Sequence, residues 1–169
     1  MINHWRHRLK GGGDKPAPHQ LSMTISSAIG CFIAISLVLL LGHITNQPFI
    51  LGSLGASCLM LFGFPDLPFS QPRNAIFGHV VSSLIGLVCL YFFADSWWGM
   101  PLALSLAVIL MITFGVVHPP AGSNPIIIFL SHPSWNFFLF PTFVGIFGLV
   151  VIALIYNNLT RKTPYPKYW

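Results

Sequence analysis

Four long apolar runs without a charged side chain constrain the fold of this chain more than any other feature. They cover residues 24–41, 74–93, 101–117 and 137–156. At about 1.5 Å of rise per residue, a helix of about 20 residues spans the hydrocarbon core of a bilayer. Charged residues make up only 7% of the 169 residues, against about 25% in an ordinary soluble domain. The sequence therefore predicts an all-α, polytopic helical membrane protein.

Two shorter apolar segments, residues 49–64 and 119–131, lie between the long runs. Each contains a Gly-Ser dipeptide, beginning at Gly52 and at Gly122, and each is bounded by proline. The order long, short, long thus occurs twice, which predicts four long spans and two half-helix or re-entrant segments, six helical segments in a pseudo-repeat. Short segments interrupted by glycine and proline at corresponding places in two halves point to a transporter site. If the short segments cross the membrane there are six spans, and if they re-enter there are four.

Basic residues are concentrated at the two ends of the chain. Every lysine and arginine except Arg73 lies within residues 6–15 or 161–167. This distribution predicts that both termini face the cytoplasm at the cell inner membrane, and it argues against nucleic-acid binding because no basic face lies on a folded module. The predicted organisation is a cytoplasmic tail over residues 1–20, a transmembrane domain over 21–158 and a second cytoplasmic tail over 159–169.

The stretch HPPAGSNP, residues 118–125, breaks the apolar pattern. Its prolines remove backbone donors, and irregular backbone within a membrane survives only inside protein or beside a water-filled cavity. A helix that starts with proline also presents free N–H groups and a positive dipole end, which is an arrangement that binds anions. The segment GSLGAS, residues 52–57, could supply a second set. The predicted substrate-binding residues are His118, Pro119, Pro120, Gly122, Ser123, Asn124, Gly52, Ser53, Gly55 and Ser57.

Small residues in membrane helices also serve helix packing. For residues 52–57 this alternative is as well supported as anion binding, and for Gly145 and Gly148 it is the better one.

Two histidines and one arginine are candidates for proton coupling or gating. His79 lies about one and a half turns into its predicted helix, and an ionisable residue at that depth is a functional candidate. Because imidazole titrates near neutral pH, His79 or His118 could carry a proton together with an anion. The alternative is a neutral histidine hydrogen-bonded to backbone. Arg73 either guides anions electrostatically or holds a helix end.

The residue types needed for enzymatic or metal chemistry are not arranged for it. The sequence lacks nucleophile-elbow, Walker and Rossmann patterns, and its three aspartates do not form a carboxylate pair. Cys31, Cys58 and Cys89 lie in apolar runs without CxxC spacing, which indicates buried apolar residues. We therefore expect no enzyme activity, no cofactor and no metal site.

The stretch HPPAGSNP resembles the motif for which the HPP family of integral membrane proteins is named. GSLGASCLMLFGFPDLPFSQPRN, followed by Gly78-His79, resembles the second characteristic block of that family. The resemblance implies a compact helical membrane domain, and plastid and cyanobacterial members are described as nitrite transporters. The motif positions fall on Gly52, Gly55, Ala56, Gln71, Pro72, Arg73, Asn74, His79, His118, Pro119, Pro120 and Gly122. Among these, Gln71 and Asn74 join His79, His118 and Arg73 as predicted gating or proton-coupling residues.

The sequence thus predicts a transporter or channel for a small anion, and the resemblance specifies nitrite. Its expected partners are the anion, the lipid bilayer and further copies of the chain, because a domain of this size provides few walls for a pore. Two alternatives remain open. One is a non-transporting assembly or sensor subunit, and the other is a channel for a small neutral solute.

Overall fold

The computed structural model describes residues 13–46 and 52–169, and over these ranges the chain is all-helical. The π turns are Leu59–Gly63 and Leu139–Phe143, and the 3-10 turns are Pro68–Ser70, Pro119–Ser123 and Trp135–Phe138. The α-helices are α2 (Leu21–Thr45), α3 (Gly52–Cys58), α4 (Pro72–Phe93), α5 (Gly99–Thr113), α6 (Asn124–Ser131) and α7 (Val144–Thr160). The predicted all-α class is confirmed. Residues 1–12 of the predicted first tail and the start of segment 49–64 lie outside the described residues.

Three of the four predicted long spans form helices that are long and apolar enough to cross a membrane. They are Leu21–Thr45, Pro72–Phe93 and Trp135–Thr160. The run at 101–117 instead gives α5, a helix of 15 residues, about 22 Å long against the 30 Å or so of a bilayer core. The helix ends at Thr113 and is followed by Gly115, whose φ of 62° is incompatible with a right-handed helix. Four long spans, and the pseudo-repeat built on them, are not confirmed.

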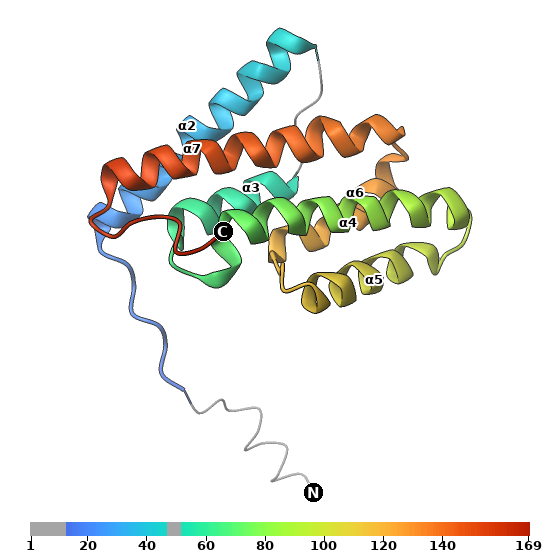
Figure 1. Ribbon diagram of the computed structural model, residues 1–169, viewed down its shortest axis with the longest axis horizontal. Coiled ribbons are helices and arrows are strands. Elements are labelled where there is room, and N and C mark those ends of the chain that lie inside the picture. Colours follow the sequence, from blue (N-terminus) through green and yellow to red (C-terminus); the bar gives the residue numbers. More distant parts are fainter. Residues whose placement is uncertain (1–12, 47–51) are drawn as a thin grey trace, which may run out of the picture.

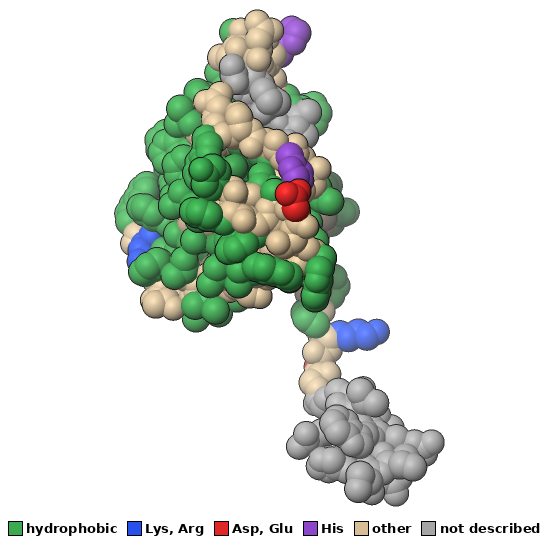
Figure 2. Space-filling view, turned by 90° about the vertical axis from the view of Figure 1, so that its right-hand side faces the viewer, with side chains coloured by type: hydrophobic (Ala, Val, Ile, Leu, Met, Phe, Trp, Pro, Cys, Tyr) green, Lys and Arg blue, Asp and Glu red, His purple; other side chains and the backbone are tan. Residues whose placement is uncertain are grey.

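The short helices pack against the long ones. α7 lies between α2 and α4, and α5 covers the other side of α4 (Figure 1). The largest apolar core joins α2, α3, α4 and α7, and it includes the fully buried Ala34, Leu61, Ile146 and Leu149. Large apolar side chains such as Phe32 and Ile155 point outward, and apolar side chains also cover much of the end view in Figure 2. This inside-outside pattern is that of a helical protein surrounded by lipid.

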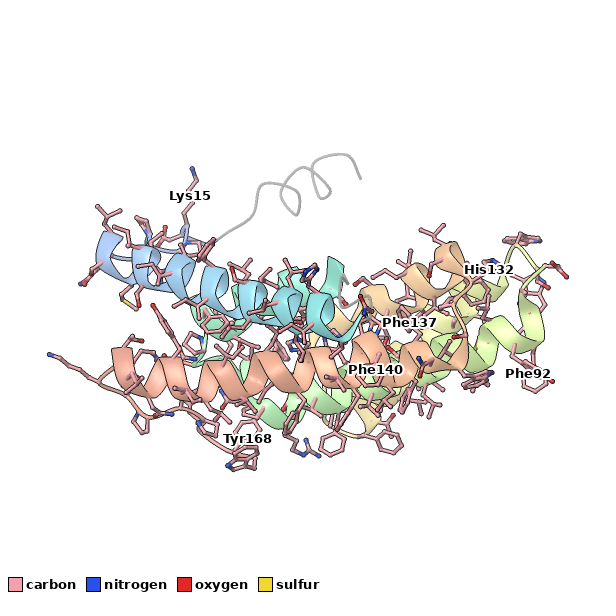
Figure 3. All side chains as sticks on the ribbon, turned by 90° about the horizontal axis from the view of Figure 1, so that it is seen from above. Lys15, Phe92, His132, Phe137, Phe140 and Tyr168 are labelled. Atoms are coloured by element: carbon pink, nitrogen blue, oxygen red, sulfur yellow. The ribbon has the colours of Figure 1, made fainter. Side chains whose placement is uncertain are left out.

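Segment 119–131 is helical throughout, as a 3-10 turn that continues into α6. It runs along α4 because glycines make room for it. A Cβ added at Gly78 would lie 2.7 Å from His118 Cβ, and one added at Gly86 would lie 2.8 Å from Ile128 Cδ1. His132, which ends α6, lies at the same end of the molecule as Phe92 of α4 (Figure 3). The segment is thus a half-helix that begins partway along α4 and runs parallel to it.

The loop at residues 64–71 meets the C-terminal segment of the chain. Asp66 forms ion pairs with Arg161 and Lys167. The Tyr165 hydroxyl donates a hydrogen bond to Ser70 O at 2.7 Å. The loop between α3 and α4 therefore lies at the same end as the C-terminus, as the arrangement with six crossing segments requires. Residues 161–169, predicted as a tail, pack on this loop.

Candidate functional site

Four fully buried polar side chains from different segments converge inside the helices. They are Ser57 of α3, His79 of α4, His118 just before the turn at Pro119–Ser123, and Asn124 at the start of α6. The ring centroids of the two histidines are 5.3 Å apart. We call these four residues the polar cluster. It joins both short segments to α4.

A continuous series of hydrogen-bonding contacts runs through the polar cluster. Asn124 Nδ2 lies 3.0 Å from His79 Nδ1. Ser57 Oγ lies 3.0 Å from His79 Nε2 and 2.9 Å from His118 Nε2. His118 Nδ1 lies 2.7 Å from the carbonyl oxygen of Phe69, in the loop at 64–71. The series therefore connects the start of α6 to the end of the molecule that carries the C-terminus.

Side chains of α4 hold the irregular backbone on which His118 lies. Ser82 Oγ donates to Ala121 O at 2.6 Å, and Asn74 Nδ2 donates to Val117 O at 3.0 Å. Because proline contributes no backbone donor, carbonyls in such a stretch depend on donors from neighbouring helices. These two bonds fix the position of His118 relative to α4.

The polar cluster is closed in this structure. The sequence predicted that residues 118–125 line a water-filled cavity, but His118 and Asn124 have no exposed surface. Their side chains are buried because they hydrogen-bond within the cluster. Two polar atoms in this region, Asn124 Oδ1 and Ser53 Oγ, are buried without a hydrogen-bond partner. An unpaired buried polar group costs about 1–3 kcal/mol, so each one calls for an explanation.

The other predicted substrate-binding residues surround the polar cluster, and Ser53 joins its hydrogen bonds through its backbone carbonyl. The carbonyl of Ser53 lies 2.9 Å from Ser57 Oγ. Ser123 Oγ is used locally and donates to Pro120 O at 2.8 Å. Pro120 is buried, Gly122 and Ser123 are half-buried, and Gly52, Gly55 and Pro119 are exposed.

Gln71, Arg73 and Asn74, predicted for gating, lie at the start of α4 and do not hydrogen-bond to either histidine. Both terminal nitrogens of Arg73 donate to carbonyls at the end of α5, to Gly115 O at 2.6 Å and Phe114 O at 3.1 Å. Gln71 Nε2 donates to two carbonyls of the loop at 64–71. Arg73 thus bonds the backbone just after α5; anchoring of a helix end and electrostatic guidance of anions both stay predictions for it.

Three hydroxyls near the polar cluster were missed by the sequence reasoning. Ser83 Oγ accepts from Asn124 Nδ2 at 2.8 Å and lies 3.2 Å from Thr142 Oγ1, and Ser82 bonds Ala121. Ser83 could have been found, because it lies four residues after His79 and residues four apart share a helix face. Thr142 has no local sequence signal, since its role depends on how the π turn Leu139–Phe143 packs against α4.

A separate cavity of about 320 Å³ opens beside α2 and α7. Its lining includes Ser27, Asn157 and Arg161. Arg161 also donates to Asp66, so this cavity lies at the C-terminal end of the molecule.

As for metals, the described residues hold no group of three or more His, Cys, Asp or Glu that could bind an ion. The two clustered histidines have serine and asparagine as neighbours.

Comparison with known proteins identifies the family. Residues 16–166 match the profile described as "HPP, transmembrane region". The chain belongs to the HPP family. Within the HPP family motif of this chain, His118 supplies one of the two imidazoles of the polar cluster, and Pro119 and Pro120 begin the half-helix. The resemblance predicted from the sequence is confirmed. The prediction that this chain is a membrane protein is confirmed as well.

Two transmembrane proteins of Dictyostelium discoideum are relatives of this HPP chain. One is 34% identical over 174 residues, which is 96% of this chain and 56% of the relative. The other is 31% identical over 182 residues, which is all of this chain and 64% of the relative. This chain therefore spans less than two thirds of the length of either relative. No solved structure matches it.

Proposed function

We propose that this protein transports a small anion across the cell inner membrane together with a proton, and that nitrite is its substrate. The observation that carries the proposal is the pair His79 and His118, bridged by Ser57, where the two short segments meet. Ionisable residues inside a membrane protein are costly and usually functional. The assignment to nitrite comes from the family resemblance, while the geometry supports the wider class of small anions.

The donors of the polar cluster explain why a proton accompanies the anion. Asn124 directs its amide nitrogen to His79 and Ser83, and Ser57 has a single hydroxyl hydrogen, so a bare anion meets no free donor there. Protonation of a histidine adds both a donor and a positive charge. A buried, unpaired imidazolium is itself costly. The anion and the proton therefore stabilise each other in the site, and each favours binding of the other.

The rest of the proposal concerns orientation and opening. Arg161 and Lys167 lie at the end that carries the loop at 64–71, and the positive-inside rule places that end in the cytoplasm. Because the polar cluster is closed, transport requires a second conformation in which it opens. We also propose that the protein forms a homo-oligomer and that its six helical segments are arranged as a pseudo-repeat.

One observation favours an assembly subunit as the second candidate. Among the described residues, no heavy atom lies within 4 Å of a Cβ added at Gly52, Gly55 or Gly122, which leaves room for the closely packed helix of a partner. On that alternative, substituting Gly55 with leucine would disrupt association, and the polar cluster would have no transport role.

The test is uptake of nitrite, nitrate, formate and chloride into liposomes that contain the purified protein, with and without an inward proton gradient. We expect the gradient to accelerate uptake, His79→Gln to abolish it, and His43→Gln, at an exposed position in α2, to leave it unchanged. Protein-free vesicles correct for diffusion of the protonated acid. Equal uptake with and without protein for every anion would exclude anion transport and leave the assembly subunit or the neutral-solute channel.

A further inference from the structure

The contacts of the polar cluster fix which nitrogen of each neutral histidine carries hydrogen. Phe69 O only accepts, so His118 Nδ1 donates to it, and His118 Nε2 must accept. Ser57 Oγ lies 2.9 Å from that Nε2 and also 2.9 Å from the carbonyl oxygen of Ser53, so its one hydrogen can be donated to either acceptor; turned towards His118, the hydroxyl donates to Nε2. His79 Nε2 must then donate to Ser57 Oγ. This leaves His79 Nδ1 as the acceptor for Asn124 Nδ2.

With the Ser57 hydroxyl turned from Ser53 O to His118 Nε2, all four hydrogen bonds point the same way, from Asn124 through His79, Ser57 and His118 to Phe69 O. We propose that these side chains form a proton-transfer path, and that a half-turn of the Asn124 amide accompanies each transfer. The coupling of this path to an anion rests on the proposed function, whereas the path itself does not.

The transfer conserves atoms and charge. A hydronium ion, or the protonated form of the anion, delivers a proton to His79 Nδ1. The His79 Nε2–H bond then breaks as a new Ser57 Oγ–H bond forms, and the original hydroxyl proton of Ser57 passes to His118 Nε2. His79 and Ser57 are again neutral, and His118 carries the charge. When the cluster opens on the side of the loop at 64–71, His118 releases its Nδ1 proton to water. Each histidine then holds its hydrogen on the opposite nitrogen, and both rings must turn over before the next transfer.

The unpaired oxygen of Asn124 fits this sequence of steps. After the transfer His79 Nδ1 carries hydrogen and faces Asn124 Nδ2, so two donors oppose each other. A half-turn of the amide places Oδ1 opposite Nδ1–H, and Ser83 Oγ–H can donate to the same oxygen. Oδ1 is the buried atom that now lacks a partner. The Asn124 amide can thus hydrogen-bond to His79 before and after the transfer, and in the present state its Oδ1 has no hydrogen-bond partner.

No carboxylate takes part in the path. The three acids of the chain are Asp14, Asp66 and Asp95. Asp66 pairs with Arg161 and Lys167 at the C-terminal end, and none of the three hydrogen-bonds to His79 or His118. The closest guanidinium in sequence, that of Arg73, bonds carbonyls at the end of α5. Two neutral imidazoles and one hydroxyl therefore carry the proton.

The direct test is nitrogen-15 NMR of histidine-labelled protein in bilayers, at alkaline pH where imidazole is neutral. His79→Gln and His118→Gln assign the two signals. We expect hydrogen on Nε2 of His79 and on Nδ1 of His118. In Asn124→Asp an ionised carboxylate only accepts, so the hydrogen of His79 should move to Nδ1. Identical tautomers in the wild-type pair, or no change in Asn124→Asp, would overturn the path.

The functional test compares gradient-driven anion uptake in three serine variants. Ser57→Ala should lower it by about 100-fold, the usual scale for losing one proton-transfer group. Ser57→Thr keeps the hydroxyl and should keep most of the uptake. Ser105→Ala removes an exposed hydroxyl of α5 and should change nothing. Gradient-driven uptake at the wild-type rate in Ser57→Ala would refute the proton-transfer path. If the wild type moves no anion, the proposed function fails, while the NMR experiment still decides the path.

Discussion

Gly78→Ala places a methyl group where α4 touches the segment that carries His118. The new Cβ would lie 2.7 Å from His118 Cβ and 3.0 Å from the carbonyl oxygen of Val116. Neither neighbour is the end of a flexible side chain, so the contact can be relieved only by moving the backbone of residues 116–118. That movement would pull His118 Nε2 away from Ser57.

The size of the effect follows from two opposing contributions. Overpacking a tight interior contact costs about 1–3 kcal/mol, and replacing glycine by alanine inside a helix returns about 1 kcal/mol. Gly148→Ala is the matched control, because its new Cβ would meet only Val38 Cγ2, at an ordinary 3.8 Å. We therefore expect Gly78→Ala to be less stable than Gly148→Ala by about 1–3 kcal/mol.

Thermal unfolding in detergent measures the difference, and about 2–4 °C of Tm corresponds to each kcal/mol for a chain of this size. Gradient-driven uptake should fall in Gly78→Ala and persist in Gly148→Ala. The reasoning is refuted if the two variants unfold at the same temperature, or if Gly78→Ala transports like the wild type.

Three further predictions concern residues outside the polar cluster. Tyr165→Phe removes the bond to Ser70 O and should lower the free energy of unfolding by about 1 kcal/mol, whereas Tyr91→Phe, at a position 72% exposed, should not. Burial raises the pKa of the Tyr165 phenol above its ordinary value. The contribution of this phenol to the free energy of unfolding is therefore complete below a pH of about 10 and declines above it. Denaturation measured across that range should show the difference in unfolding free energy between the wild type and Tyr165→Phe becoming smaller as the pH rises. Arg73→Gln frees the α5 carbonyls and should lower Tm, with the KM for nitrite unchanged; a higher KM at unchanged Tm would instead indicate electrostatic steering. His132→Gly relieves a left-handed φ of 45° and should stabilise the protein by about 1 kcal/mol, the usual preference for glycine at such a helix end; a lower Tm would contradict this.

The sequence predicted what depends on local backbone chemistry. Pro119 and Pro120 interrupt an apolar run, and because irregular backbone is not exposed to lipid, His118 was expected inside the protein, beside a water-filled cavity; the structure instead buries it among hydrogen-bonding side chains. The depth of His79 in a long apolar run similarly marked it as unusual. These arguments place two histidines in the interior, but they do not specify the distance between them.

The sequence could not predict what depends on packing between distant segments. Ser57 was one of several small residues in GSLGAS, and only the position of α3 against α4 makes it the bridge between the rings. Residues 161–169 were predicted to form part of a basic tail. In the structure, hydrogen bonds from Tyr165 and Lys167 attach them to the loop at 64–71. α5 was predicted too long because hydrophobicity continues past Thr113, while Gly115 ends the helix by its φ angle. The closed state of the polar cluster likewise depends on hydrogen bonds among side chains from three segments.

Coupled entry of protons and nitrite is the most direct measurement of the account. Vesicles containing the protein and an internal pH dye would receive nitrite under an inward proton gradient, with both fluxes followed together and the leak of protein-free vesicles subtracted. The account predicts that protons and nitrite enter in about equal numbers, because one imidazolium neutralises one anion, and that both fluxes stop in His79→Gln. Nitrite entry at the same rate without the gradient, or with no accompanying acidification, would contradict it.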